Sequence, residues 1–225
     1  MKDYIFNQGY YTTRKGEFEL ELYNDLNMPE SDDDDTFNSK HPVDLEVGLT
    51  DHLQLAAYEV FAWDRSEDWR QSEYKIEAKY RFLQSGELPV DVALYAEYAN
   101  PDGHRKISSD EIEGKLILSR DIGKWNLVAN LITEREINTH EDWKWSTTAG
   151  ISYAVKPKVR LGLELQEMLG DQGEFGVHRK DHALQLMPTI AASLTPHARI
   201  LFGPAVGLTR AADDLQLKSI LEIEF

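Results

Sequence analysis

Apolar and polar residues alternate strictly over long parts of this sequence. From Tyr74 to Phe82, every even-numbered position is aromatic or aliphatic and every odd-numbered position is Lys, Glu or Arg. The segment Leu215 to Phe225 follows a similar pattern. Successive side chains of a β-strand point to opposite faces, so each segment predicts a strand with one apolar and one charged face. An amphipathic helix would place its apolar residues three and four positions apart instead.

The same pattern predicts about twelve strands. They are expected at Glu17–Leu26, Val43–Leu49, Leu53–Trp63, Tyr74–Phe82, Val90–Tyr98, Ile112–Ser119, Trp125–Thr133, Trp143–Val155, Val159–Leu165, Leu184–Leu194, Ile200–Leu208 and Leu215–Phe225. An even number of antiparallel strands is typical of single-chain bacterial membrane barrels. A chain of 225 residues is also an ordinary length for one all-β domain, so we expect a single β-barrel domain over residues 1–225.

The connections between these strands fall into two alternating classes. Short ones are expected around Asp51, Gly86, Gly123, Pro157 and Pro196, and longer polar ones around Asp33, Glu67, Gly103, His140, Gly173 and Ala212. Short periplasmic turns and longer outer loops are typical of an up-and-down transmembrane barrel. A soluble sandwich has no physical reason to sort its loops in this way.

Aromatic residues favour a membrane barrel over a soluble one. Trp63, Trp143 and Trp145 are expected at the long-loop ends of strands, whereas Trp125, Tyr80, Phe82, Tyr153 and Phe225 are expected at the short-turn ends. Membrane barrels carry aromatic girdles at both interfaces. We therefore expect the apolar face to contact lipid and the charged face to line the lumen. A soluble antiparallel barrel or sandwich, with its charges in water, is the alternative.

The lumen is then expected to be lined by mixed charges. The predicted lining residues are Glu19, Glu21, Glu46, Lys75, Glu77, Lys79, Arg81, Glu97, Glu113, Lys115, Glu134, Arg160, Glu164, Arg199, Lys218, Glu222 and Glu224. Charges of this kind set a local field for a passing solute, so we expect a channel for small solutes, with a slight preference for cations. The alternative is a closed barrel, filled by salt bridges, that has a structural role or binds through its outer loops.

Composition narrows the possible partners. Forty acidic and twenty-four basic residues give a net charge of −16, which argues against a nucleic-acid partner. The chain has no cysteine and no apolar run of eighteen residues, so it offers neither a disulfide nor a transmembrane helix. Residues 1–11 also lack the apolar core of a signal peptide, as expected of an exported protein after processing. Residues 1–15 are expected to form an N-terminal periplasmic segment.

No catalytic residue, metal site or cofactor is predicted. An outer-membrane lipid-modifying enzyme is the rival class, because small phospholipases place a Ser and a His together on a barrel wall. All seven histidines are expected in loops, turns or strand starts, and no serine has an evident mid-strand histidine partner. The acidic run Asp32 to Asp35 is interpreted as an outer loop rather than a cation site, and the basic run His178 to Lys180 as a possible contact for lipopolysaccharide phosphates.

Three short features resemble known outer-membrane proteins. A chain that ends on an aromatic residue after an amphipathic strand, here Phe225, resembles the closing strand of bacterial outer-membrane barrels, where this ending is an assembly signal. The run from Gly48 to Gln54 and the pair Gly203-Pro204 look like parts of small outer-membrane transporters of Gram-negative bacteria. The resemblance implies the bacterial outer membrane, contact with membrane lipid and lipopolysaccharide, recognition of Phe225 by the barrel-assembly machinery, and small solutes as cargo.

Some positions disagree with regular strands. Pro188 and Pro204 lie within predicted strands and remove ladder donors, and counting from the intervening turn predicts one shared kink or bulge. Glu59 interrupts an apolar face, which predicts a bulge near Ala56 and Ala57 that turns it inward. At the seam, Lys218, Glu222 and Glu224 are expected to meet Glu19 and Glu21.

Overall fold

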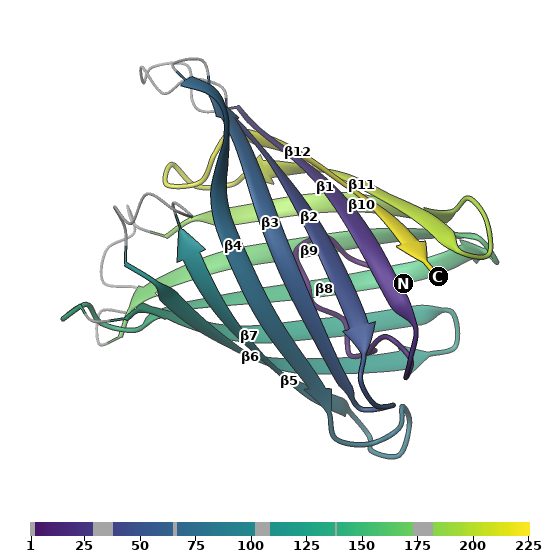
Figure 1. Ribbon diagram of the computed structural model, residues 1–225. Coiled ribbons are helices and arrows are strands. Elements are labelled where there is room, and N and C mark those ends of the chain that lie inside the picture. The colour runs from purple at the N-terminus through teal and green to yellow at the C-terminus, as the bar shows by residue number, and fades with distance from the viewer. Residues whose placement is uncertain (1–2, 29–37, 65–66, 102–108, 138, 173–181) are drawn as a thin grey trace.

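The computed structural model is a closed barrel of twelve antiparallel strands, in which each strand pairs with the next and β1 pairs with β12 (Figure 1). It describes residues 3–28, 38–64, 67–101, 109–137, 139–172 and 182–225. The strands are β1 (Phe18–Met28), β2 (Asn38–Gly48), β3 (Leu53–Asp64), β4 (Glu67–Arg81), β5 (Asp91–Pro101), β6 (Glu111–Ile122), β7 (Trp125–Glu136), β8 (Lys144–Lys156), β9 (Val159–Asp171), β10 (Leu184–Ser193), β11 (Ala198–Gly207) and β12 (Leu215–Glu224). The up-and-down order confirms the predicted fold class.

The apolar face points outward and the charged face points inward. On β4, Ile76 and Tyr80 are 56% and 44% exposed, whereas Glu77 and Lys79 between them are 6% and 5% exposed. A barrel in water would show the opposite pattern, because burying apolar side chains is the main source of its stability. A lipid-facing wall around a polar interior is the pattern of a transmembrane barrel.

The sorted connections are largely confirmed. At one end β6 and β7 are joined by two residues, of which Gly123 has a φ of 63° that favours glycine. The long connection expected around Glu67 differs, because β3 continues to Asp64 and β4 already begins at Glu67. The acidic run Asp32 to Asp35 and the basic run His178 to Lys180 lie outside the described residues.

Aromatic residues gather at the short-turn end as predicted. Trp125 and Tyr153 lie with ring centroids 4.6 Å apart, and Phe18 stacks on Phe225 with centroids 6.1 Å apart. Phe18 and Phe225 also exchange two backbone hydrogen bonds of 3.0 Å. The barrel is therefore closed down to the last residues of its seam.

The two prolines lie directly opposite each other. β10 and β11 pair at Leu186 with Val206 and again at Ile190 with Phe202, and no pairing occurs at the three positions between them. The register on both sides is the same, so the shared interruption is confirmed but it involves no bulge. An opposed pair of prolines loses the ladder bonds of both strands at a single place.

Two predictions on strand geometry are wrong. β3 pairs regularly with β4 from Leu53 to Val60, so no bulge lies at Ala56 and Ala57 and Glu59 stays on the outward face; the register shifts lie beyond Val60. At the seam Glu21 pairs with Glu222 as expected, but Lys218 pairs with Asp25. Their charged groups lie 2.8 Å apart, because the register places Lys218 opposite Asp25, four residues beyond Glu21 and six beyond Glu19.

Candidate functional site

All seventeen predicted lining residues lie on the inward face, and none is exposed. Eight are buried, with exposed fractions of 9% or less: Glu19, Glu21, Glu46, Glu77, Lys79, Glu164, Arg199 and Glu222. The other nine are partly buried: Lys75, Arg81, Glu97, Glu113, Lys115, Glu134, Arg160, Lys218 and Glu224. Charges in such numbers remain inside a barrel only when ion pairs, hydrogen bonds or water satisfy them.

Opposite charges pair both within strands and between neighbouring ones. Lys75 Nζ on β4 lies 2.9 Å from a carboxylate oxygen of Glu97 on β5 and 3.4 Å from one of Glu73 on its own strand. On β6, Lys115 Nζ lies 2.8 Å from Glu113. These pairs keep the lumen wall polar and restrict the side chains.

The N-terminal segment, which the structure describes from Asp3 on, runs inside the barrel. Within it, Tyr4, Asn7 and Tyr10 are 2%, 3% and 1% exposed. This corrects the expectation of a periplasmic segment. The segment instead satisfies its polar groups with inward-facing side chains of the strands.

Glu164 on β9 holds the middle of this segment. Its carboxylate accepts hydrogen bonds from the backbone N–H groups of Ile5, Phe6 and Asn7, at 2.8, 2.8 and 3.0 Å, and from Asn7 Nδ2 at 2.9 Å. Hydrogen bonds to a charged group are about twice as strong as neutral ones. Because Glu164 is fully buried, these four donors also compensate for the water that its carboxylate loses.

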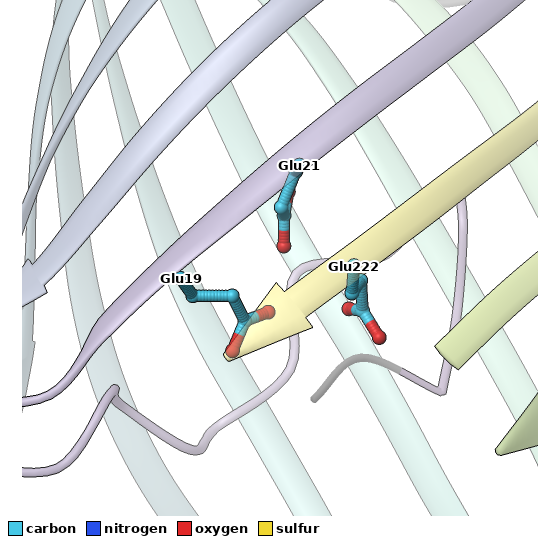
Figure 2. Close-up of side chains that lie close together, drawn as sticks. All are labelled: Glu19, Glu21 and Glu222. Carbon is cyan, nitrogen blue, oxygen red and sulfur yellow. The ribbon is translucent and has the colours of Figure 1, made fainter. Parts of the chain in front are cut away.

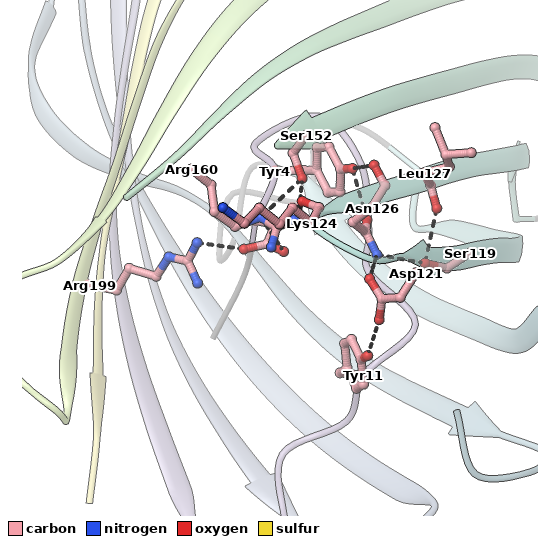
Figure 3. A network of polar contacts seen from close by, with 11 residues as sticks. Tyr4, Tyr11, Ser119, Asp121, Lys124, Asn126, Leu127, Ser152, Arg160 and Arg199 are labelled. Carbon is pink, nitrogen blue, oxygen red and sulfur yellow. Dashed lines mark hydrogen bonds and ion pairs between the residues drawn. The ribbon is translucent and has the colours of Figure 1, made fainter. Parts of the chain in front are cut away.

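Further contacts fix the segment at its start and along its length (Figure 3). Arg199 and Arg160 lie 2.5 and 3.2 Å from the two carboxylate oxygens of Asp3. Tyr4 donates its hydroxyl hydrogen to Asn126, whose side-chain and backbone oxygens both lie 2.8 Å away. The contacts of Asp3 come from β9 and β11 and those of Tyr4 come from β7, so the segment is attached to several strands at once.

Its later residues contact another part of the wall. Tyr10 donates to the backbone oxygen of Leu83, Tyr11 donates to Asp121 at 2.5 Å, and Thr13 N donates to Gln54 Oε1 at 2.8 Å. Partial burial and the hydrogen bond to Asp121 raise the pKa of Tyr11 to about 12. This phenol therefore stays neutral and able to donate at ordinary pH.

Two inward-facing glycines leave room for the segment. A Cβ on Gly150 would lie 2.7 Å from the Tyr4 ring, and one on Gly48 would lie 2.0 Å from the backbone oxygen of Arg14. Larger residues there would displace the chain. These glycines, together with the aromatic residues of the first eleven positions, were the available sequence signals for the occupied lumen.

Cavities remain on both sides of the segment. One of about 300 Å³ lies on the long-loop side and is lined by Phe6, Tyr58, Lys75 and Lys218 among others. A second, of about 260 Å³, shares Phe6. A much smaller one of about 50 Å³ lies beneath Tyr4 and Tyr10 towards the short turns. The segment thus narrows the lumen near its short-turn end.

Buried acids gather at the seam. Glu19 and Glu21 on β1 and Glu222 on β12 point toward one another (Figure 2), and each offers a carboxylate oxygen within 4.8 Å of the others. Asp44 and Glu46 form a similar group with Glu21. Carboxylates are ligands for hard cations, but each of these five acids takes part in further interactions, so the grouping alone does not define a metal site.

Similar solved structures are outer-membrane channels. The chain superposes on an outer-membrane channel from Pseudomonas putida F1 with a TM-score of 0.70 and 13% identity, covering 99% of this chain and 100% of the other. It superposes on the KdgM and NanC porins with TM-scores of 0.63 and 0.62 and identities of 8% and 10%, covering 92% of this chain and 98% of each porin. No protein-family model and no curated protein matches the sequence.

The chain therefore has the fold of a porin-like outer-membrane β-barrel with twelve strands. The described residues contain no helix that is long and apolar enough to cross a membrane.

Proposed function

We propose that the protein is a channel of the bacterial outer membrane that passes small solutes through a lumen lined by mixed charges. The observation that carries the proposal is the inward charged face, with cavities of about 300 and 260 Å³ on the long-loop side. The fold shared with channels and porins supports it. The seventeen lining residues would form the solute path, and the acids outnumber the bases ten to seven among them, which favours cations slightly.

The N-terminal segment favours a second candidate, a closed barrel with a structural or loop-mediated binding role. The segment fills the lumen between the larger cavities and the short turns, so passage requires either a narrow path beside it or its displacement. In the channel proposal the segment sets the size limit for solutes. In the closed-barrel proposal it seals the lumen.

Single-channel recording in planar bilayers separates these candidates. The channel proposal predicts small, ohmic, weakly cation-selective steps for the full chain and larger steps after deletion of residues 3–13. A matched control replaces the same residues by a Gly/Ser sequence of equal length, which keeps the chain length but removes the side-chain contacts. A folded full-length protein that conducts no ions would overturn the channel proposal, and larger steps in the deletion variant alone would support the closed barrel.

We propose that membrane lipid and lipopolysaccharide surround the outward apolar wall, and that the barrel-assembly machinery recognises the end of β12 at Phe225. A Phe225→Ala variant tests the second point. It is expected to yield less heat-modifiable, folded barrel in outer-membrane fractions, and an unchanged yield would contradict it.

A further inference from the structure

Three polar side chains form a hydrogen-bonded line on the outward wall. His41 Nδ1 lies 3.0 Å from Asn24 Oδ1, and His41 Nε2 lies 3.0 Å from Ser39 Oγ. Ser39 and His41 are on β2 and Asn24 is on the neighbouring β1. They share the outward face with Leu45, which is 46% exposed. The sequence pattern did not predict this contact, because the predicted strand began at Val43, whereas β2 begins at Asn38.

The contacts fix the tautomer of the imidazole. An amide oxygen only accepts hydrogen bonds, so Nδ1 of His41 carries the hydrogen that Asn24 Oδ1 receives. In the neutral ring Nε2 is then an acceptor, and Ser39 Oγ donates to it. Asn24 Nδ2 in turn donates to Ser219 Oγ at 3.4 Å, which orients the amide with its oxygen toward His41.

This arrangement contains the parts of a nucleophilic triad. A hydroxyl donates a hydrogen bond to the unprotonated nitrogen of an imidazole, and the N–H of the same ring donates to a group that fixes the tautomer. Such triads are recognised by geometry and role, independently of sequence order. A structural role would require only that each polar group has a hydrogen-bond partner. It would not require the order found here, in which the Ser39 hydroxyl donates to the His41 ring and the ring donates to the Asn24 amide oxygen.

The position suits a lipid substrate. Ser39, His41 and Asn24 lie in the long-loop halves of their strands, and Ser39 pairs in register with Trp63. The ring of His41 lies 4.8 Å from that of Trp69. Tryptophans are enriched where acyl chains meet headgroups, and the ester bonds of acyl lipids lie at that depth.

We propose that Ser39, His41 and Asn24 form a hydrolytic site for acyl esters of membrane amphiphiles. Ser39 and His41 would be the catalytic residues and Asn24 a positioning residue. Ser39 is only 4% exposed, so the side chains over it must move aside when an acyl chain enters. The site lies on the outer wall and is independent of whether the lumen conducts.

The reaction balances with water as the second substrate. Ser39 Oγ attacks the ester carbonyl carbon while its proton passes to His41 Nε2. The carbon–oxygen bond to the alcohol breaks, and the leaving alkoxide takes that proton. Water then attacks the acyl-serine, gives a proton to Nε2, and releases the fatty acid as the proton returns to Ser39 Oγ.

The test uses the full-length barrel refolded in detergent micelles, with p-nitrophenyl palmitate as substrate and an alkyl fluorophosphonate as covalent label. We expect the protein to hydrolyse the ester. In peptide mass spectrometry, we expect Ser39 to be the single phosphonylated serine. Ser39→Ala and His41→Ala are expected to lower the rate about 1000-fold or to background. Thr147→Ala, which removes an outward-facing hydroxyl on β8, is the matched control and keeps the wild-type rate.

Asn24 is tested by a readout that packing alone would not change. Asn24→Leu is expected to lower the rate roughly tenfold or more and to alter the pH–rate profile, because the tautomer is no longer fixed. Asn24→Asp keeps an acceptor oxygen and is expected to restore activity. Heat-modifiability on gels confirms that each variant is folded. A folded wild-type barrel that hydrolyses no ester and is not labelled at Ser39, or an active Ser39→Ala variant, would overturn the proposal.

Discussion

The hydrogen bonds of Glu164 to the N-terminal segment can be tested by a substitution that changes only its carboxylate group. Glu164→Gln keeps the size of the side chain but removes its charge and replaces one acceptor oxygen by a donor. Four donors from Ile5, Phe6 and Asn7 now face this carboxylate at 2.8 to 3.0 Å. At least one of them loses its acceptor and the others bind a neutral group.

The magnitude follows from the strength of these bonds. A hydrogen bond to a charged group contributes about 1.5–3 kcal/mol, and the four act together rather than additively. We expect the segment to be held about 3 kcal/mol less tightly, which is roughly a 150-fold change in the ratio of released to seated states. Backbone amides exchange with solvent only while the segment is released, so their exchange rate rises by the same factor as the released population.

Hydrogen exchange measures this directly, whether or not the barrel conducts. In Glu164→Gln the amides of residues 5–7 are expected to exchange roughly 150-fold faster, with unchanged protection in β9. Glu167→Gln is the matched control, because it lies on the same strand and contacts His182 rather than the segment. If residues 5–7 keep wild-type protection in Glu164→Gln, the carboxylate does not hold the segment and the reasoning is refuted.

Other parts of the structure give further predictions. Gly150→Val should push Tyr4, 2.7 Å from the new Cβ, out of its site and enlarge conductance steps as the deletion of residues 3–13 does; wild-type steps would show that the segment tolerates the side chain. Lys218→Glu should remove the contact with Asp25 and add repulsion, lowering the free energy of unfolding by about 1–3 kcal/mol in denaturant titrations; unchanged stability would show that the pair contributes nothing. Asp3→Asn should speed exchange of the first residues only a few-fold, because the carboxylate is partly exposed, and the effect should vanish in about 1 M salt; a salt-independent effect would contradict an ionic origin.

Two substitutions serve as controls for these variants. Gly114→Val changes an outward-facing glycine, where an added Cβ would lie 3.9 Å from its nearest neighbour, the methyl group of Thr133, so conductance should not change. Lys158→Glu reverses a charge in the exposed turn between β8 and β9, so stability should change little.

The sequence by itself determined the architecture of the wall. Alternation in segments such as Tyr74 to Phe82 has the period of a strand, and a strand has only two faces, so local pattern alone separates lipid-facing from inward-facing residues. Sorted connections and terminal aromatics then predicted an up-and-down barrel in a membrane. The inward position of all seventeen charges followed from the same period.

Only the tertiary structure decided which side chains meet. Pairing of Lys218 with Asp25 depends on the register of two strands that are nearly the whole chain apart, and a shift of a few residues changes every partner. The course of residues 3–15 depends on hydrogen-bond acceptors spread over several strands, with Glu164 at their centre. No periodic pattern in the sequence predicts such a segment. The contact of His41 with Ser39 and Asn24 likewise required the true start of β2 and its register with β1. Local periodicity determines which face of the wall a side chain lies on, whereas closure of the whole barrel determines which side chains it contacts.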